Sequence, residues 1–294
     1  MTTGRAAREG AEVPGIRRTH AYLRGVGGVR LFYRSWEPEG AGARVVLVHG
    51  LGDHSGRWER VAETLASRGL AVHAPDLRGH GRSRGRRGHA ASFDHLLRDL
   101  DRLRRAAGPR GRRGRVVLLG HSLGGLIVLR HLQAFPSPAV AGAAAAAPFL
   151  RLRADVPEWK LTLGRLADRW LPGLTMDAEL DRDELLRQPE ERERYRRDPL
   201  VHQRISARLW GEMQREARRI REDPHTGRPV LLQVAGDDRI VDPDAVEDLG
   251  RRRPAGTEVR VYPRAFHDLY HDPDAPDALG DLLEWVEAVA ARSA

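Results

Sequence analysis

Cysteine is absent from this chain of 294 residues. Disulfide bonds, thiolate metal sites and a cysteine nucleophile are therefore excluded, and any chemistry must use oxygen and nitrogen atoms. Long apolar runs are also missing. No stretch approaches the roughly eighteen apolar residues of a membrane-spanning helix, and residues 1–18 lack the apolar core of a secretory signal. We therefore expect a cytoplasmic protein, which can still contact a membrane surface peripherally.

Lysine is nearly absent too, because Lys160 is the only lysine and the other basic residues are arginines. The formal net charge is +9, yet the arginines are spread along the whole chain among acidic neighbours. This distribution is typical of a compositional bias, and we expect no nucleic-acid partner. Two local basic runs, 82–87 and 102–115, are interpreted as solvated faces and loops, with an anionic lipid head group as the alternative interpretation.

Among the polar residues that are present, Ser122 stands out by its neighbours. It is the serine of a Gly-His-Ser-Leu-Gly string, residues 120–124, which follows the apolar residues 116–119 and precedes the helix-like residues 126–132. A glycine-rich chain produces such a string by chance, but most chance matches fall in loops, whereas this one joins a strand to a helix. The pattern predicts a nucleophile elbow, which exposes the serine hydroxyl and points the Leu123 N–H at a developing oxyanion.

Strand-like and helix-like segments alternate along most of the chain. The alternation predicts an α/β fold whose central sheet is mostly parallel and flanked by helices, with ligand sites at the carboxyl ends of the strands. Strands are predicted at residues 31–36, at an edge of the sheet, and at 45–48, 70–73, 116–119, 140–147, 230–234 and 258–262. Helices are predicted at 58–67, 93–107 and 279–291.

This rhythm breaks between residues 149 and 227, where a highly charged helical pattern replaces it. We expect a first part of the core at 1–148, an inserted helical cap at 149–227 and a second part of the core at 228–294. The cap carries an apolar stripe at helical spacing, formed by Trp159, Leu163, Leu166 and Trp170. The stripe is interpreted as a helix face packed on its own domain. An acyl channel or a membrane contact is the alternative, and it can hold together with that packing, because a cap covers the cleft beneath it.

A serine nucleophile needs a base to take its proton and an acid to hold that base in the right tautomer. In this fold the chain order is serine, acid, histidine. Asp237 and Asp238 follow the predicted strand 230–234, so one of them is the expected acid. His267 follows the next predicted strand in a short loop and is the expected base, whereas His271, one helical turn later, is the rival.

The second oxyanion donor is expected in the loop after the predicted strand 45–48. Residues 49–52 read His-Gly-Leu-Gly, and the two glycines let the backbone turn its amides inward, so we choose the Leu51 N–H. An ordinary glycine-rich turn explains this string equally well when it is taken alone. The elbow, the acid and the histidine follow three predicted strands in the expected chain order. Together they predict a serine hydrolase site.

These residues resemble the monoacylglycerol lipase and lysophospholipase branch of the α/β hydrolases, and the resemblance runs from about residue 20 onward. The oxyanion loop carries Asp53 and Trp58 where Glu and Tyr are common. The motifs that carry the resemblance are residues 49–58, 76–83 with Gly85, Gly88 and Phe93, 198–200, 236–241 and the loop of His267. The resemblance implies an α/β-hydrolase fold with an inserted cap.

The resemblance also implies a role for each site residue. Ser122 is implied as the nucleophile, Asp238 as the acid and His267 as the base. The amides of Leu51 and Leu123 are implied as the oxyanion donors, and Asp237 becomes a loop residue. The cap, where the substrate is chosen, matches the family least.

The implied reaction is hydrolysis of a carboxylic ester, such as a monoacylglycerol or a lysophospholipid, through an acyl-enzyme. This chemistry needs no metal and no cofactor, and the expected partner is a small lipid ester. The expected acyl-pocket residues are His121, Trp159, Leu163, Leu166 and Trp170. An aminopeptidase or acyltransferase with the same triad, and a hydrolase-fold binding protein without activity, are the alternatives.

Overall fold

The computed structural model describes residues 14–107, 115–154, 156–178, 181–253 and 256–291. The strands of its main sheet are β1 Ile16–Arg24, β2 Arg30–Pro38, β3 Ala43–Val48, β4 Leu70–Pro75, β5 Val116–His121, β6 Val140–Ala146, β9 Val230–Ala235 and β10 Thr257–Tyr262. They are arranged in the order β1-β2-β4-β3-β5-β6-β9-β10. The pairs β1–β2 and β2–β4 are antiparallel, and all later pairs in this order are parallel.

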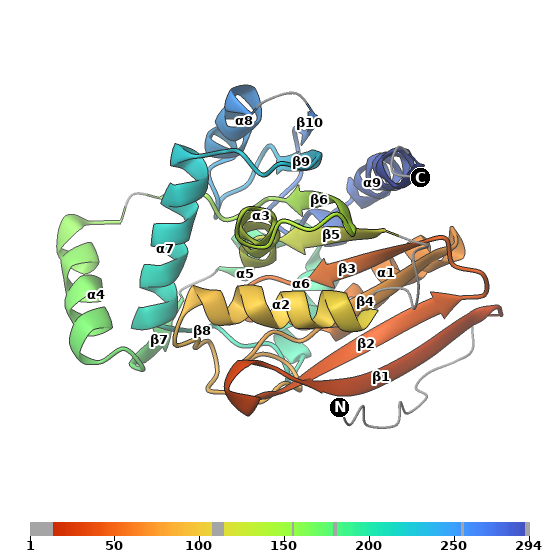
Figure 1. Cartoon of the computed structure of the whole chain (residues 1–294). Helices are drawn as coiled ribbons and strands as arrows, with labels where there is room; N and C mark the ends of the chain where they lie inside the picture. Colours follow the sequence, from red (N-terminus) through yellow and green to blue (C-terminus); the bar gives the residue numbers. More distant parts are fainter. Residues whose placement is uncertain (1–13, 108–114, 155, 179–180, 254–255, 292–294) are drawn as a thin grey trace.

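Helices cover both faces of this sheet (Figure 1). One face packs against α2 Phe93–Ala107, α3 Leu123–Ala134 and α8 Pro243–Arg252, and the other against α1 Glu59–Ser67 and α9 Ala275–Ala291. α7 Ala207–Glu222 packs on α2 and α3 from the outside. Side chains of each strand alternate between the two cores, as the period of a strand requires. In β3, for example, Val46 and Val48 face the first group of helices, whereas Val45 and Leu47 face the second.

A helical segment connects β6 to β9. It contains α4 Glu158–Trp170, β7 Thr175–Asp177, α5 Arg182–Leu185, α6 Pro189–Arg197, β8 Arg204–Ser206 and then α7. β7 and β8 form a separate antiparallel pair. β6 and β9 pair directly with each other, so this long connection does not interrupt the sheet. Figure 1 shows α4 on the outer side of α7, away from the sheet.

The predicted fold class, an α/β fold with a mostly parallel central sheet, is confirmed. The predicted strands and helices all have counterparts at nearly the predicted positions. The prediction that residues 31–36 form an edge strand is wrong, because β1 pairs with β2 along its whole length and takes the edge. β1 was missed because its sequence, IRRTHAYLR, has no apolar run and its side chains are mostly half-buried.

The apolar stripe of α4 is exposed. Trp159, Leu163, Leu166 and Trp170 expose 62%, 56%, 50% and 71% of their surface. The expectation that this stripe packs on its own domain is therefore wrong. α4 meets α7 through another part of its surface, where the Asp168 carboxylate forms ion pairs with arginines of α7, Arg208 at 2.8 Å and Arg215 at 3.1 Å.

No helix in the part of the chain that the structure describes combines the length and the apolar character needed to cross a membrane. The basic run 102–115 lies partly outside the described residues, which omit 108–114. The run 82–87 follows β4 in a long loop, where the Arg87 guanidinium donates a hydrogen bond to the Gly81 carbonyl at 2.7 Å.

Candidate active site

The nucleophile elbow lies between β5 and α3. The Ser122 backbone has φ 53° and ψ −116°, a positive φ that a serine adopts only where its surroundings enforce it. The surroundings are tight, because a Cβ at Gly120 would overlap the Gly124 carbonyl and a Cβ at Gly124 would overlap the Val48 carbonyl. Glycines at these two positions therefore let β5, the first turn of α3 and the end of β3 meet at the serine.

Three side chains form a hydrogen-bonded chain at this point. Ser122 Oγ lies 2.9 Å from His267 Nε2, and His267 Nδ1 lies 2.7 Å from Asp238 Oδ2. Asp238 follows β9 and His267 follows β10, so the carboxyl ends of three parallel strands supply the three groups. Asp238 Oδ1 accepts hydrogen bonds from the N–H groups of Ile240 and Val241, each at 2.8 Å. The remaining carboxylate oxygen accepts from His267 Nδ1–H, which leaves Nε2 as an acceptor facing the serine.

The environment of His267 suits the role of a base that the sequence predicts. Burial alone would lower the pKa of His267, but the hydrogen-bonded Asp238 carboxylate and the nearby Asp268 raise it above the ordinary value of a histidine. His121 holds the backbone of the same residue, because its Nε2–H donates to the His267 backbone carbonyl at 2.9 Å. Burial lowers the pKa of His121 to about 4, so that ring is neutral at pH 7. The structure thus places His121 against the base.

The two rival residues are engaged elsewhere. Asp237 is partly exposed and forms a long ion pair with Arg239 at 3.4 Å. His271 Nδ1 lies 2.8 Å from an Asp268 carboxylate oxygen, and its Nε2 lies 2.9 Å from the Arg57 carbonyl. Burial would lower the pKa of His271, but Asp268 raises it, in agreement with a ring whose two nitrogens both face acceptors. Such a ring has no free acceptor for a serine proton.

A buried ionic cluster adjoins His267, and the sequence did not predict it. The Arg57 guanidinium lies 3.0 Å from Asp268 and 3.3 Å from Asp53, and the Trp58 indole N–H donates to Asp53 at 2.8 Å. Burial alone would raise the pKa of Asp53, but Arg57 lowers it to about 2. The same holds for Asp268. Burial alone would raise its pKa, but His271 and Arg57 together hold the pKa well below the ordinary value of an aspartate. The signal available in the sequence was the acidic residue directly after the base.

The two predicted oxyanion amides belong to residues next to Ser122 or next to a residue that lies against it. Gly50 lies against the nucleophile, because a Cβ placed on it would come within 3.3 Å of Ser122 Cβ. The next amide is that of Leu51, and the amide of Leu123 opens α3 directly after Ser122. Within the described residues, neither N–H donates a hydrogen bond to another protein group. Both amides are therefore available to a substrate oxygen.

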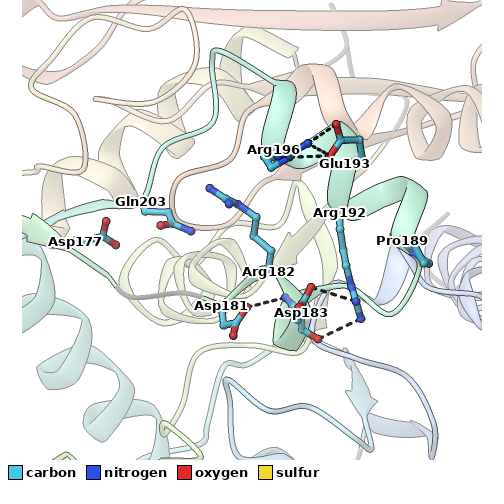
Figure 2. A pocket seen from close by; sticks show the side chains of 9 residues that line it. All are labelled: Asp177, Asp181, Arg182, Asp183, Pro189, Arg192, Glu193, Arg196 and Gln203. Atoms are coloured by element: carbon cyan, nitrogen blue, oxygen red, sulfur yellow. Dashed lines mark hydrogen bonds and ion pairs between the residues drawn. The ribbon is translucent and has the colours of Figure 1, made fainter.

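A polar pocket of about 640 Å³ lies in the segment between β6 and β9 (Figure 2). Arg192 forms an ion pair with Asp183 at 3.1 Å, and Arg196 forms one with Glu193. Figure 2 shows the Arg182 side chain extending across the pocket between these pairs. The lining residues are Asp177, Asp181, Arg182, Asp183, Pro189, Arg192, Glu193, Arg196 and Gln203, and they include none of the predicted acyl-pocket residues.

No group of three or more His, Asp or Glu side chains is placed to hold a metal ion in the portion of the chain that the structure describes.

Known proteins are similar to this chain in both sequence and fold. A family described as serine aminopeptidase, S33, matches residues 40–274. The monoacylglycerol lipase of Mycolicibacterium smegmatis is 32% identical over 295 residues, which cover 93% of this chain and 98% of that protein. The crystal structure of Paleococcus ferrophilus monoacylglycerol lipase superposes with a TM-score of 0.81 at 32% identity, over 88% of this chain and 99% of that one. An uncharacterized abhydrolase domain-containing protein of Dictyostelium discoideum is 30% identical over 87% of this chain, which spans 28% of that longer protein.

Proposed function

The chain belongs to the monoacylglycerol lipase branch of the α/β hydrolases, a branch of serine ester hydrolases, and on that premise we propose that Ser122 hydrolyses a lipid ester through an acyl-enzyme. The proposed substrate is a monoacylglycerol or a lysophospholipid. The single observation that carries the proposal is the hydrogen-bonded chain from Ser122 through His267 to Asp238, with distances of 2.9 Å and 2.7 Å.

The chemical steps follow from this geometry. Ser122 Oγ attacks the ester carbonyl carbon while His267 Nε2 takes the hydroxyl proton. The tetrahedral intermediate collapses, the bond to the alcohol breaks, and His267 returns the proton to the leaving alcohol. Water then attacks the acyl-enzyme by the same route and releases the fatty acid. Asp238 stabilises the imidazolium that forms in both halves of the reaction.

The N–H groups of Leu51 and Leu123 bind the oxygen that becomes negative in each tetrahedral intermediate. Removing one such donor typically costs about 3–4 kcal/mol of transition-state stabilisation. The α3 N-terminus contributes partial positive charge at the same position. Its first turn is clear of acidic side chains, so no carboxylate competes there with the substrate oxygen.

We assign residues 149–227 as a cap over the site, between core segments 1–148 and 228–294. Two contacts to the oxyanion loop support this division. The His202 N–H donates to the Gly52 carbonyl at 2.9 Å, and His54 Nε2 lies 2.8 Å from the Asp198 carboxylate. A cap held in this way covers the approach to Leu51 and selects the ester that reaches Ser122.

The exposed stripe of α4 supports a transient membrane contact as part of the proposed function. Trp159 and Trp170 lie at the two ends of the helix, 62% and 71% exposed, with two exposed leucines between them. Tryptophan is enriched at membrane–water interfaces, and an exposed apolar helix face binds lipid head-group regions. A lipase whose substrate resides in a membrane gains access to it through such a face. Acyl contact by the same four side chains stays a prediction.

A second candidate function is hydrolysis of a peptide amide, because the matching family is described as serine aminopeptidase. The same triad serves esters and amides, and it also serves acyl transfer to an alcohol in place of water. A binding protein without activity is a further alternative. Two relatives that are 32% identical to this chain, one over 93% of it and the other over 88%, are both called monoacylglycerol lipases, which favours the ester.

A hydrolysis screen tests the proposal. The purified chain is assayed with a short p-nitrophenyl ester, with monoacylglycerols and lysophospholipids of graded chain length, and with an aminoacyl p-nitroanilide. We expect ester turnover that Ser122→Ala lowers at least about 1,000-fold. Ser67→Ala, at an exposed serine of α1, is the matched control and keeps full activity. Substantial ester hydrolysis by Ser122→Ala, or turnover of the anilide alone, contradicts the proposal.

A further inference from the structure

His49 lies directly after β3 and is fully buried, yet it belongs to neither the triad nor the pair of oxyanion amides. Both of its ring nitrogens are engaged with backbone groups. His49 Nε2 lies 3.0 Å from the Leu77 amide nitrogen, and His49 Nδ1 lies 2.7 Å from the Gly50 carbonyl oxygen. The buried His49 ring therefore connects the loop after β3 to the loop after β4.

These two contacts decide the tautomer of the ring. The Leu77 N–H can only donate, so His49 Nε2 must accept and carries no proton. The proton of a neutral ring then resides on Nδ1, which donates it to the Gly50 carbonyl. Burial lowers the pKa of His49, which keeps the ring neutral at pH 7 and the arrangement intact.

The hydrogen bond to Gly50 controls the amide of the next residue. The Gly50 carbonyl and the Leu51 N–H belong to one planar trans peptide, in which the two groups point in opposite directions. Fixing the carbonyl therefore fixes the direction of the N–H. If this peptide rotated, the carbonyl would present its own negative end to the substrate oxygen and the donor would be lost.

The loop needs such a restraint, because glycines flank Leu51 on both sides. Glycine has access to both signs of φ, and Gly52 adopts a φ of 75°. The far side of the loop is held by the cap, since the His202 N–H donates to the Gly52 carbonyl at 2.9 Å. The near side is held by His49. Leu51 thus lies between two restrained carbonyls, those of Gly50 and Gly52.

We propose that His49 is a positioning residue, whose Nδ1–H holds the Gly50 carbonyl and thereby points the Leu51 N–H into the oxyanion hole. The inference rests on the proposed ester hydrolysis, because His49 is inferred to help stabilise the oxyanion that forms in that reaction. His49 touches no reacting atom, so its removal affects stabilisation of the oxyanion and leaves binding of the uncharged ester nearly unchanged.

Two substitutions separate the two hydrogen bonds of the ring. In His49→Asn the shorter side chain places an amide nitrogen near the Nδ1 position and keeps a donor for the Gly50 carbonyl. In His49→Gln the longer side chain reaches the Nε2 position and keeps an acceptor for the Leu77 N–H. His73→Gln is the matched control, because His73 is a buried histidine of β4 whose ring makes no hydrogen bond within the described residues.

For His49→Gln we expect kcat to fall about 100-fold, with KM changed less than about threefold. Affinity for a trifluoromethyl ketone, which forms an oxyanion adduct with the serine, falls in the same proportion as kcat/KM. His49→Asn restores kcat to within about tenfold of the wild type, and His73→Gln keeps both parameters. A merely structural role would lower the melting temperature of both His49 variants without moving the ketone affinity.

Other outcomes overturn the inference. Wild-type kcat in His49→Gln, equal losses in the Asn and Gln variants, or unchanged ketone affinity each contradict it. A measurement on the unaltered protein is independent of folding of the variants: nitrogen NMR of the labelled imidazole must show the Nδ1–H tautomer for His49, and an Nε2–H tautomer refutes the proposal. If the wild type does not hydrolyse esters through Ser122, the proposed function itself fails and the inference fails with it.

Discussion

Ser122 keeps its positive φ of 53° because its peptide groups are held on both sides. Its N–H donates to the Ala146 carbonyl at 3.0 Å, and its own carbonyl accepts from the N–H groups of Leu126 and Phe149, each at 3.0 Å. A strained residue of this kind costs roughly 1–3 kcal/mol and persists only where its surroundings over-determine it. Neighbouring segments therefore impose the exposed position of the hydroxyl.

The proposed base, His267, sets the pH dependence of ester hydrolysis. Only the neutral His267 ring accepts the serine proton, so kcat/KM falls as the pH decreases through its pKa. Asp238 and Asp268 hold this pKa above the ordinary value of about 6.5 for a histidine, so the fall begins at a higher pH than for an unperturbed ring. A pH profile of kcat/KM with a short ester checks this. An acid limb centred below the ordinary value contradicts it.

Replacing the acid tests its role separately. In Asp238→Asn the amide stabilises neither the imidazolium nor the Nδ1–H tautomer, so we expect kcat to fall about 10,000-fold. The residual activity should show its acid limb at a lower pH, because the charge that raised the pKa of His267 is gone. The matched control is Asp237→Asn, which should keep wild-type kinetics. If Asp237→Asn is the more damaging change, Asp237 and not Asp238 is the acid.

At the scale of elements, the short segment before α1 is bound to the loop after β10 by the buried Arg57. This guanidinium pairs with Asp53 and Asp268, so Arg57→Met leaves two buried carboxylates without their cation. We expect a loss of about 3–5 kcal/mol in the free energy of unfolding, measured by urea denaturation. Arg60→Met, at an exposed arginine three residues on, should change it by less than about 0.5 kcal/mol. Equal effects of the two substitutions would show that the cluster does not stabilise the fold.

The same cluster predicts how the free energy of unfolding changes at acidic pH. The pKa of Asp53 is lowered to about 2, below the value of about 3.9 that an unfolded aspartate has. The stabilisation is therefore complete above the unfolded pKa and is lost as the pH falls through about 2. In Arg57→Met this loss should begin at a higher pH, because the largest opposition to burial, which raises the carboxyl pKa, is then removed. Urea denaturation of both proteins across acidic pH measures the shift.

The elements that the sequence predicted share one property, which is a local signal. β3, β5 and β9 are short apolar runs bounded by glycines or prolines, and their carboxyl ends placed the elbow, the oxyanion loop and the acid on one edge of the sheet. β1 is polar and half-buried and owes its structure to pairing with β2, a contact distant in sequence. Hydrophobic pattern alone therefore did not indicate it.

The stripe of α4 shows a second limit of pattern reading. The helical spacing correctly grouped four apolar residues on one face, but the period of a helix does not say which face is buried. α4 turns Asp168 toward the arginines of α7 and its apolar stripe toward solvent. The ionic cluster around Arg57 was missed for a related reason, because Arg57 and Asp268 lie more than two hundred residues apart in the chain and meet only in the folded structure.

For the whole molecule, the exposed face of α4 indicates which side of the protein would meet a bilayer. Large exposed side chains continue beyond the helix at Leu171, Leu174 and Met176, which expose 59%, 47% and 44% of their surface. Exposed apolar patches of this kind mark contact surfaces on proteins. Since the patch belongs to the proposed cap, docking it on a bilayer would bring the cap next to the lipid that the site hydrolyses.

Trp159→Ser combined with Trp170→Ser tests that approach. We expect weaker cosedimentation with phosphatidylcholine vesicles containing anionic lipid, and a lower rate on vesicle-borne monoacylglycerol, because the variant buries less apolar surface. The rate on a short dissolved ester should not change. Val261→Ser, on the distant strand β10 and 43% exposed in the wild type, is the control for removing exposed apolar surface. If vesicle binding is unaffected by the tryptophan changes, α4 is not the docking face.

Covalent labelling with a fluorophosphonate, followed by mass spectrometry of tryptic peptides, shows directly whether Ser122 is the nucleophile. Cleavage after Arg115 and Arg130 releases residues 116–130, a peptide in which Ser122 carries the only hydroxyl side chain. We expect one adduct, on this peptide, formed in step with loss of ester hydrolysis and absent from Ser122→Ala. An adduct on another peptide that accompanies the loss of activity, or full hydrolysis with no adduct on residues 116–130, would contradict it.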